Sequence, residues 1–347
     1  MKFYTGQHRF FCGIDLHARS MFLCILDSQG NVLVHKNIKA TPEDFLNIVT
    51  PYREDLAVAV ECIFSWYWLA DLCARENIPF ILGHALYMKA IHGGKSKNDK
   101  IDALKIATLL RGGMIPQAYV YPAQMRATRD LLRRRMHLMR KRAELLAHIQ
   151  NTTSQYNLPE FEKVIAYKKN RTGIADVFPD PTVRASITAD LELIDHYDDL
   201  LKRLELFILR SARVHDPNAL LLLRSVPGIG KILSLVILYE IHDVARFPSV
   251  QDFASYSRLV RCPHISAGKR VGSGGRKIGN AHLKWAFSEA AVLFLRGNPE
   301  AQAWLARQAA KHGKPKALSI LAHKLGRTVY HILTKERAFE MNRFLAD

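Results

Sequence analysis

Four acidic residues occupy positions at which their carboxylates could act together. Asp15 ends the first predicted strand, and Glu61 ends the fourth. Asp99 and Asp102 are three positions apart in a predicted helix, so their side chains share one helix face. Because sites in α/β sheets are built at strand ends, we expect all four carboxylates to converge if the first and fourth strands are neighbours.

Carboxylates gathered in this way require a cation, because like charges at short range repel by several kcal/mol. An all-oxygen ligand set suits Mg²⁺, with Mn²⁺ as the alternative. Such an ion can bind phosphate oxygens, activate an attacking oxygen and stabilise a leaving one. Each acid taken singly is as well explained as a solvated cap or turn residue, so the predicted metal site depends on the whole set.

The predicted strands and helices that must position these acids lie within residues 1–120. Three apolar runs at residues 10–14, 21–26 and 32–34 are joined by short connections and predict an antiparallel meander. Strands at residues 56–60 and 79–82 then alternate with helices at about 42–49, 66–76 and 99–111. This order is typical of an α/β ribonuclease H-like domain, with the acids on its strand ends and last helix.

Residues 121–215 predict a central helical segment. Its apolar residues recur at the 4-3 spacing of a coiled coil, in a strongly basic stretch: Leu132, Met136, Met139, Ala143 and Leu146. A second helical pattern covers about residues 187–214 and is acidic at first. The two patterns predict either an antiparallel helical hairpin or a coiled coil between molecules.

Residues 216–347 predict a mainly α-helical C-terminal domain. A helix is expected from Lys231 to about His242, followed by a basic, glycine-rich loop from Arg258 to Asn280. Two further helices are expected, one to about Leu295 and one from Pro299 to the end of the chain.

The charge of the chain indicates a polyanionic partner. Lys and Arg number 50 against 32 Asp and Glu, a formal net charge of +18 over 347 residues. Nucleic acid is the simplest such partner. No apolar run approaches the ~20 residues of a spanning helix, and no signal peptide is evident, so no membrane partner is expected. The 5 cysteines contain no paired spacing typical of zinc or of a disulfide framework, which favours a reducing cytoplasm.

Two segments of the C-terminal domain could contact phosphates. Pro227-Gly228-Ile229-Gly230 resembles a helix-hairpin-helix turn, although a tight turn before a core helix explains it equally well. Ser266 precedes a basic loop in which a serine is more often a turn former or phosphate contact than a nucleophile. The residues predicted to bind nucleic acid are Lys97, Lys100, Arg126, Arg133, Arg134, Gly228, Gly230, Lys269, Arg270, Arg276 and Lys277.

The chain resembles the insertion sequence 110 family of transposases. Gly13-Ile14-Asp15, Val60-Glu61 and the run 97–103 resemble the Asp-Glu-Asp-Asp pattern of its RuvC-like domain. Val226-Pro227-Gly228-Ile229-Gly230, Ser266 and Lys277-Ile278-Gly279-Asn280 with Leu283 resemble its second characteristic domain. These motifs span almost the whole chain in the family's order.

The resemblance implies more than the residues alone. It implies that Asp15, Glu61, Asp99 and Asp102 bind Mg²⁺ and that Ser266 attacks a DNA phosphate to form a covalent phosphoserine link. It also implies a structured guide RNA that pairs with donor and target DNA, and a dimer or tetramer with active sites assembled from two subunits. A bacterial or archaeal cytoplasm, at the nucleoid, is the expected location. The family usually has Gly directly after the serine, whereas Ala267 stands here, so Ser273 is a rival nucleophile.

Three interpretations follow from the sequence. The first is a transposase or recombinase with a serine nucleophile and a metal-binding carboxylate tetrad. The second is a metal-dependent, structure-specific endonuclease of the Holliday-junction type, with water as nucleophile. The third is a nucleic-acid-binding scaffold. A covalent protein–DNA adduct supports the first, cutting without an adduct the second, and salt-sensitive binding without cutting the third.

Overall fold

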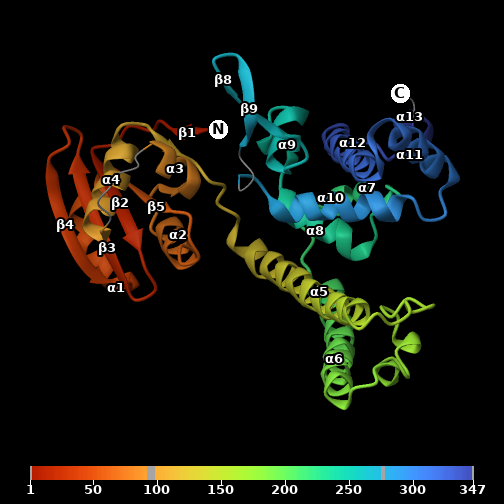
Figure 1. The fold of residues 1–347 in the computed structure, drawn as a ribbon. Coiled ribbons are helices and arrows are strands. Elements are labelled where there is room, and N and C mark those ends of the chain that lie inside the picture. The colour runs from red at the N-terminus through yellow and green to blue at the C-terminus, as the bar shows by residue number, and fades with distance from the viewer. Residues whose placement is uncertain (1, 92–97, 275–277, 346–347) are drawn as a thin grey trace. The chain divides into compact units, whose positions relative to one another are not determined.

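A computed structural model describes residues 2–91, 98–274 and 278–345 of the chain, and Figure 1 shows its fold. The chain divides into two compact units, Met1–Ala123 and Gln124–Asp347. The further predicted division of the second unit, near residue 216, stays a prediction.

The first unit is built on a five-stranded mixed sheet in the order β4-β3-β2-β5-β6. The meander of β2, β3 and β4 is antiparallel, whereas β5 pairs in parallel with both β2 and β6. The first long strand and the strand ending at Glu61 are therefore neighbours, which was the condition for the expected convergence of the carboxylates. The strands are β2 (Phe10–Leu16), β3 (Ser20–Asp27), β4 (Val32–Lys39), β5 (Leu56–Glu61) and β6 (Phe80–Gly83).

Helices cover both faces of this sheet. On one face, α1 (Pro42–Val49) and α2 (Tyr67–Arg75) bury Phe45 and Leu69 against strand residues such as Ile14 and Val60. On the other face, α4 (Asp99–Arg111) buries Ala103 and Ile106 against the sheet. The remaining elements are α3 (Ala85–Ile91) and the short pair β1 (Phe3–Tyr4) and β7 (Ile115–Pro116).

The second unit begins with two long helices, α5 (Ala123–Gln155) and α6 (Pro181–Ser211). Ion pairs between them run in opposite directions along the two helices: Arg135 with Glu205, Arg142 with Asp198, and His148 with Asp190. Apolar residues of both helices also share one core, including Ile149 and Ile187. The two helices therefore run antiparallel within one chain, which is one of the two arrangements that the sequence left open. The acids of α6 neutralise part of the basic face of α5.

The rest of the second unit is mainly helical and has one large core. Its buried residues come from every long helix, and Tyr239, Phe253, Phe287 and Phe294 are the largest that are fully enclosed. The helices are α7 (Pro217–Arg224), α8 (Lys231–Ile241), α9 (Val250–Tyr256), α10 (Ala281–Phe294), α11 (Pro299–His312), α12 (Lys314–Lys335) and α13 (Met341–Leu345).

The secondary structure of this unit differs from the sequence-based expectation in two segments. The segment from Arg258 to Asn280 is not only a loop, because it contains a β-hairpin of β8 (Cys262–Ser266) and β9 (Lys269–Gly274). The last 49 residues are not one helix, because Gly313 adopts a positive φ of 79° between α11 and α12. A backbone with positive φ cannot continue a right-handed helix, and glycine adopts it without strain.

No helix among the described residues combines the length and apolar character needed to cross a bilayer.

Candidate active site

Gly13 of β2 sets how closely α4 lies against the sheet. A Cβ atom at Gly13 would lie 2.1 Å from the backbone nitrogen of Ala107 and 2.5 Å from the carbonyl oxygen of Ala103. The helix backbone therefore rests directly on the strand, which only a glycine permits. Gly13 and Asp15 share one face of β2 because strand side chains alternate. The close contact brings the first turn of α4 over Asp15.

The start of α4 is fixed by its N-cap. The side chain of Asn98 accepts a hydrogen bond from the backbone N–H of Ile101 at 2.8 Å, and Gly112 follows the last residue of the helix. This cap makes Asp99 the first residue of the helix, one turn before Ala103. Asp99 therefore lies at the N-terminus of α4, next to the C-terminal end of β2.

Asp15, His17 and Asp99 form one group. The Nε2 atom of His17 lies 3.6 Å from Oδ2 of Asp15 and 3.3 Å from Oδ2 of Asp99. One ligand atom from each of the three residues lies within 4.8 Å of the other two. The Asp15 side chain is 16% exposed and that of Asp99 is 56% exposed, so the group lies between the sheet and the solvent.

Glu61 and Asp102 are near neighbours of this group in the fold but are outside it. Ile14 of β2 pairs with Val60 of β5, so Asp15 and Glu61 take the next position on adjacent parallel strands and face α4 together. Asp102 lies one helical turn from Asp99, and its carboxylate is 3.5 Å from Nζ of Lys105. The structure thus brings Asp15 and Asp99 together directly, and places Glu61 and Asp102 on the flanking strand and helix turn.

His17 is the residue that sequence reasoning missed. The signal was present in Asp15-Leu16-His17, since residues two apart in a strand point to the same face. The backbone N–H of His17 donates to the carbonyl of Ser20 at 2.9 Å, which closes the turn between β2 and β3. This turn fixes the backbone from which the imidazole reaches the two carboxylates.

The group has the composition of a divalent cation site. Two carboxylates and an imidazole nitrogen within ligand distance of one another, with a third carboxylate on the next strand, are donors that Mn²⁺ and similar ions accept. Of the flanking lysines, Lys100 is exposed and its carbonyl accepts a hydrogen bond from Nε2 of His35 at 2.9 Å. Lys97 lies outside the described residues.

Ser266 lies at the tip of the β8–β9 hairpin. It pairs with Lys269 across the two-residue turn of Ala267 and Gly268, whose φ angles are 47° and 74°. Two positive φ angles identify a type I′ turn, which suits the twist of a hairpin. Ser266 and Lys269 are both exposed, so a nucleic-acid backbone can reach them.

Other predicted residues of this segment are only partly covered by the structure. Ser273 belongs to β9 by its backbone, and Arg270 follows Lys269 on the same strand. The side chains of these two residues, and the whole of Arg276 and Lys277, lie outside the described residues.

A buried polar network anchors the chain where it leaves the hairpin. Asn280 donates from Nδ2 to Glu240 of α8 at 2.7 Å, and its Oδ1 caps α10 by accepting from the backbone N–H of His282 and Leu283. Burial alone would raise the pKa of Glu240, but the hydrogen bond from Arg133 and the charges of Arg129 and Arg133 outweigh it. They lower that pKa from 4.5 to about 2.

The predicted basic surface of α5 divides into buried and exposed arginines. Arg126 is 5% exposed, and Arg133 donates two hydrogen bonds to Glu240 at 2.6 and 2.9 Å. Arg126 is therefore buried and Arg133 is paired with Glu240, whereas Arg134 is exposed. The sequence alone did not separate them, because Glu240 is 107 positions from Arg133.

The two glycines of the predicted phosphate-binding turn differ in surroundings. A Cβ at Gly228, which has φ 84°, would lie 2.6 Å from the backbone nitrogen of Phe294, so this glycine allows close packing on α10. Gly230 is exposed, is the N-cap of α8, and has no atom within 4 Å of the position of a Cβ. Of the two, Gly230 leaves room for a phosphate at the helix N-terminus.

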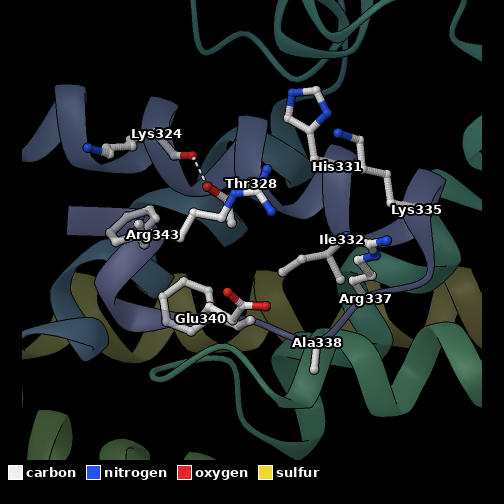
Figure 2. A pocket seen from close by; sticks show the side chains of 11 residues that line it. Lys324, Thr328, His331, Ile332, Lys335, Arg337, Ala338, Glu340 and Arg343 are labelled. Carbon is white, nitrogen blue, oxygen red and sulfur yellow. Dashed lines mark hydrogen bonds between the residues drawn. The ribbon is translucent and has the colours of Figure 1, made fainter. Parts of the chain in front are cut away.

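A cationic pocket of about 260 Å³ lies between α12 and α13 (Figure 2). Lys335, Arg337 and Arg343 line it together with the single acid Glu340. Burial lowers the pKa of His331 in the same wall, and the charges of nearby Lys335, Arg327 and Arg343 lower it further. The positive charge of the C-terminal domain is therefore locally concentrated here.

Comparison with known proteins agrees with this geometry. A model of DEDD transposases of the IS110 type matches residues 12–158, and a model described as "Transposase IS116/IS110/IS902 family" matches residues 220–306. The first match covers the sheet, α4 and α5. The second covers α7 to α10, including the β8–β9 hairpin that carries Ser266, here called the serine hairpin. The expected ribonuclease H-like α/β domain followed by a mainly helical region is thus confirmed.

Two similar proteins extend the match over nearly the whole chain. A protein of Pseudomonas aeruginosa named "Probable family 20 transposase" is 25% identical over 348 aligned positions, covering 94% of this chain and 97% of that protein. The "Transposase for insertion sequence element IS1328" of Yersinia enterocolitica is 22% identical, with the same coverage of 94% and 97%. Since both characteristic domains are present in the family's order, the chain belongs to the IS110 family of transposases, enzymes that transfer phosphoryl groups on DNA.

Proposed function

We propose that this transposase cuts and rejoins DNA through a covalent intermediate on Ser266. Attack by Oγ forms a bond to phosphorus and breaks one phosphate ester bond of the strand, which releases a DNA hydroxyl. Attack by another DNA hydroxyl on the phosphoserine then reverses this chemistry and joins a new strand. The observation that carries the proposal is the exposed position of Ser266 at a type I′ turn, opposite the exposed cation of Lys269.

We propose that Asp15, Glu61, Asp99 and Asp102 hold Mg²⁺, with Mn²⁺ as a substitute. A divalent ion bound there would supply charge neutralisation at phosphate oxygens and stabilise the leaving oxygen. The protein residues contribute rigidity: two acids are fixed on adjacent strands, and two on one helix turn that Gly13 holds against the sheet. The separation among these acids is therefore set by packing before DNA arrives.

Donor and target DNA are the proposed partners, together with a structured RNA encoded by the same element. Exposed cations on both units, such as Lys100, Arg134 and Lys269, support a nucleic-acid surface. Gly230 supports a phosphate contact at the start of α8. A dimer or tetramer is proposed because the family resemblance implies active sites built from two subunits.

The deciding experiment looks for the covalent intermediate. Wild-type protein is incubated with Mg²⁺, end-labelled element DNA and RNA transcribed from beside the gene, and a labelled band that survives denaturation is sought. We expect the band with wild type and with the control Ser288→Ala, and no band with Ser266→Ala. Loss of the band only in Ser273→Ala would assign the nucleophile to Ser273 instead.

Other outcomes identify the alternatives. Metal-dependent cutting of branched DNA with no adduct in any variant would show a junction endonuclease that uses water. Absence of both cutting and adduct in Asp15→Ala, with normal folding, is expected if the carboxylates serve the chemistry. Strand exchange that proceeds at full rate without RNA would remove the guide RNA from the proposal.

A further inference from the structure

We propose that His17 is an additional ligand of the divalent ion, bound through Nε2 and placed between Asp15 and Asp99. This inference rests on the proposed metal site and adds a nitrogen donor to a set that the carboxylate pattern alone would make all-oxygen. Its consequence is a preference of the site for Mn²⁺ over Mg²⁺ that the four acids would not give.

The first argument is the spacing of the donor atoms. Nε2 of His17 is 3.6 and 3.3 Å from the nearest carboxylate oxygens of Asp15 and Asp99. Adjacent donors around an octahedral ion with bonds of ~2.1 Å lie about 3.0 Å apart, and opposite donors about 4.2 Å apart. The two separations from His17 fall between these values, and one ligand atom from each of the three residues lies within 4.8 Å of the other two.

The second argument is that the same distances are poor for direct hydrogen bonds. Charged N–H···O contacts are ordinarily ~2.7–2.9 Å long. Both contacts of His17 exceed this range, and its side chain is 47% exposed. An exposed histidine ion pair at such distances contributes little to stability. The arrangement suits an ion shared by three donors better than it suits a pair of salt bridges.

The third argument is how His17 is held. It follows β2 directly, and its backbone N–H is bonded to Ser20 in the turn to β3, so its position relative to Asp15 is set by the sheet. Asp99 approaches from α4, which Gly13 holds against the same strand. A nitrogen donor held by the same two rigid elements as the carboxylates is oriented for binding without a loop movement.

The chemical consequence follows from ligand preference. Imidazole suits transition metals, whereas Mg²⁺ prefers oxygen donors and retains its water. Replacing His17 with a side chain that cannot offer an imidazole should weaken Mn²⁺ binding more than Mg²⁺ binding. The change in selectivity is a signature that a purely structural role of His17 would not produce.

The test uses the full-length protein loaded with Mn²⁺ and examined by pulsed electron paramagnetic resonance. Wild type should show the coupling of a directly bound nitrogen, and the frequency should change when histidine is labelled with ¹⁵N. His17→Gln should lose this coupling and bind Mn²⁺ about tenfold more weakly, a loss typical of removing one group that supports a metal site. Mg²⁺ affinity, measured by competition, should change much less.

Two controls separate the possible failures. His196→Gln replaces an exposed histidine of α6 and should leave the nitrogen coupling and both affinities unchanged. Asp15→Asn should abolish Mn²⁺ binding while thermal unfolding still shows a folded protein. If Mn²⁺ binding depends on Asp15 but wild type shows no nitrogen coupling, the role of His17 is refuted and the carboxylate site stands. If Mn²⁺ binding is indifferent to Asp15, the metal site itself fails.

Discussion

Arg133 of α5 holds Glu240 of α8 with two hydrogen bonds, from Nε at 2.6 Å and from Nη2 at 2.9 Å. Glu240 is 2% exposed, and Arg129 and Asn280 donate to the same carboxylate. The buried Glu240 therefore links α5 to Asn280. Asn280 caps α10 and is the last residue of the segment that contains the β8–β9 hairpin.

We expect Glu240→Ala to destabilise the protein strongly. The substitution leaves the buried Arg129 and Asn280, and the partly exposed Arg133, without their shared partner, and breaking a buried ion pair typically costs about 3–5 kcal/mol. Thermal or urea unfolding of the full chain measures the loss. Glu205→Ala is the matched control, because Glu205 pairs with Arg135 at a partly exposed site and should cost less than about 1 kcal/mol. Equal losses in the two variants would contradict the structural role of Glu240.

The same carboxylate makes stability depend on pH in acid. The folded state lowers the pKa of Glu240 from 4.5 to about 2, so its contribution is complete above pH 4.5 and is lost as the pH falls towards 2. The contribution corresponds to about 3 kcal/mol. The free energy of unfolding of wild type relative to Glu240→Gln should therefore shrink across this interval. A difference that stays constant from pH 6 to pH 3 would show that the carboxylate is not preferentially ionised in the fold.

Gly13→Ala should separate α4 from β2. The new methyl group would lie 2.1 Å from the backbone nitrogen of Ala107, which is part of a helix and cannot move away alone. We expect a loss of about 1–3 kcal/mol in stability and weaker Mn²⁺ binding, because Asp99 moves with the helix. Gly230→Ala, at a position with no atom within 4 Å, should retain wild-type stability and metal affinity. Unchanged metal binding in Gly13→Ala would contradict this account of the site.

Ala267→Asn should make the serine hairpin more rigid. Ala267 has φ 47°, a left-handed conformation that costs an ordinary residue about 1 kcal/mol, and Asn-Gly is a preferred type I′ turn. Hydrogen exchange of the backbone amides of Ser266 and Lys269 should slow in Ala267→Asn and accelerate in Ala267→Val. Faster exchange in the asparagine variant would show that the turn has another conformation in solution.

Arg134→Ala should weaken nucleic-acid binding without loss of stability. Its exposed guanidinium is a candidate phosphate contact, so the slope of log affinity against log salt should fall by about 1. Arg133→Ala should instead lower the unfolding temperature, because it breaks the pairing with Glu240. A salt slope unchanged in Arg134→Ala would remove this residue from the nucleic-acid surface.

Local signals predicted much of the N-terminal unit. The helix from Asp99 to Arg111 was predicted with the bounds that the structure shows, because its apolar residues recur on one face and Gly112-Gly113 is a typical helix end. The neighbourhood of Glu61 and Asp15 was expected only as a condition for a shared site, and the parallel pairing of β2 with β5 meets that condition.

The features that the sequence did not reveal depend on distant or unusual contacts. The β8–β9 hairpin was expected as a loop, because β8 contains Pro263, β9 contains Gly272 and Gly274, and the turn places Ala267 at a positive φ. The pairing of Arg133 depends on Glu240, 107 positions away, and no local pattern marked Arg126 as buried, so the basic stretch of α5 looked uniformly available. His17 lacked a distinctive motif, because an acid and a histidine two positions apart occur often in exposed strands.

The contact between Gly13 and α4 sets the distance between the sheet and the helix, and with it the size of the candidate active site. Asp15 and Glu61 belong to the sheet, whereas Asp99 and Asp102 belong to the helix above it. The distance between the two pairs of carboxylates therefore depends on the size of the side chains between sheet and helix. Gly13, Ala103 and Ala107 are the residues at this contact. Substituting larger or smaller side chains at these positions would increase or decrease the distance between the two pairs of carboxylates, with no acidic residue replaced.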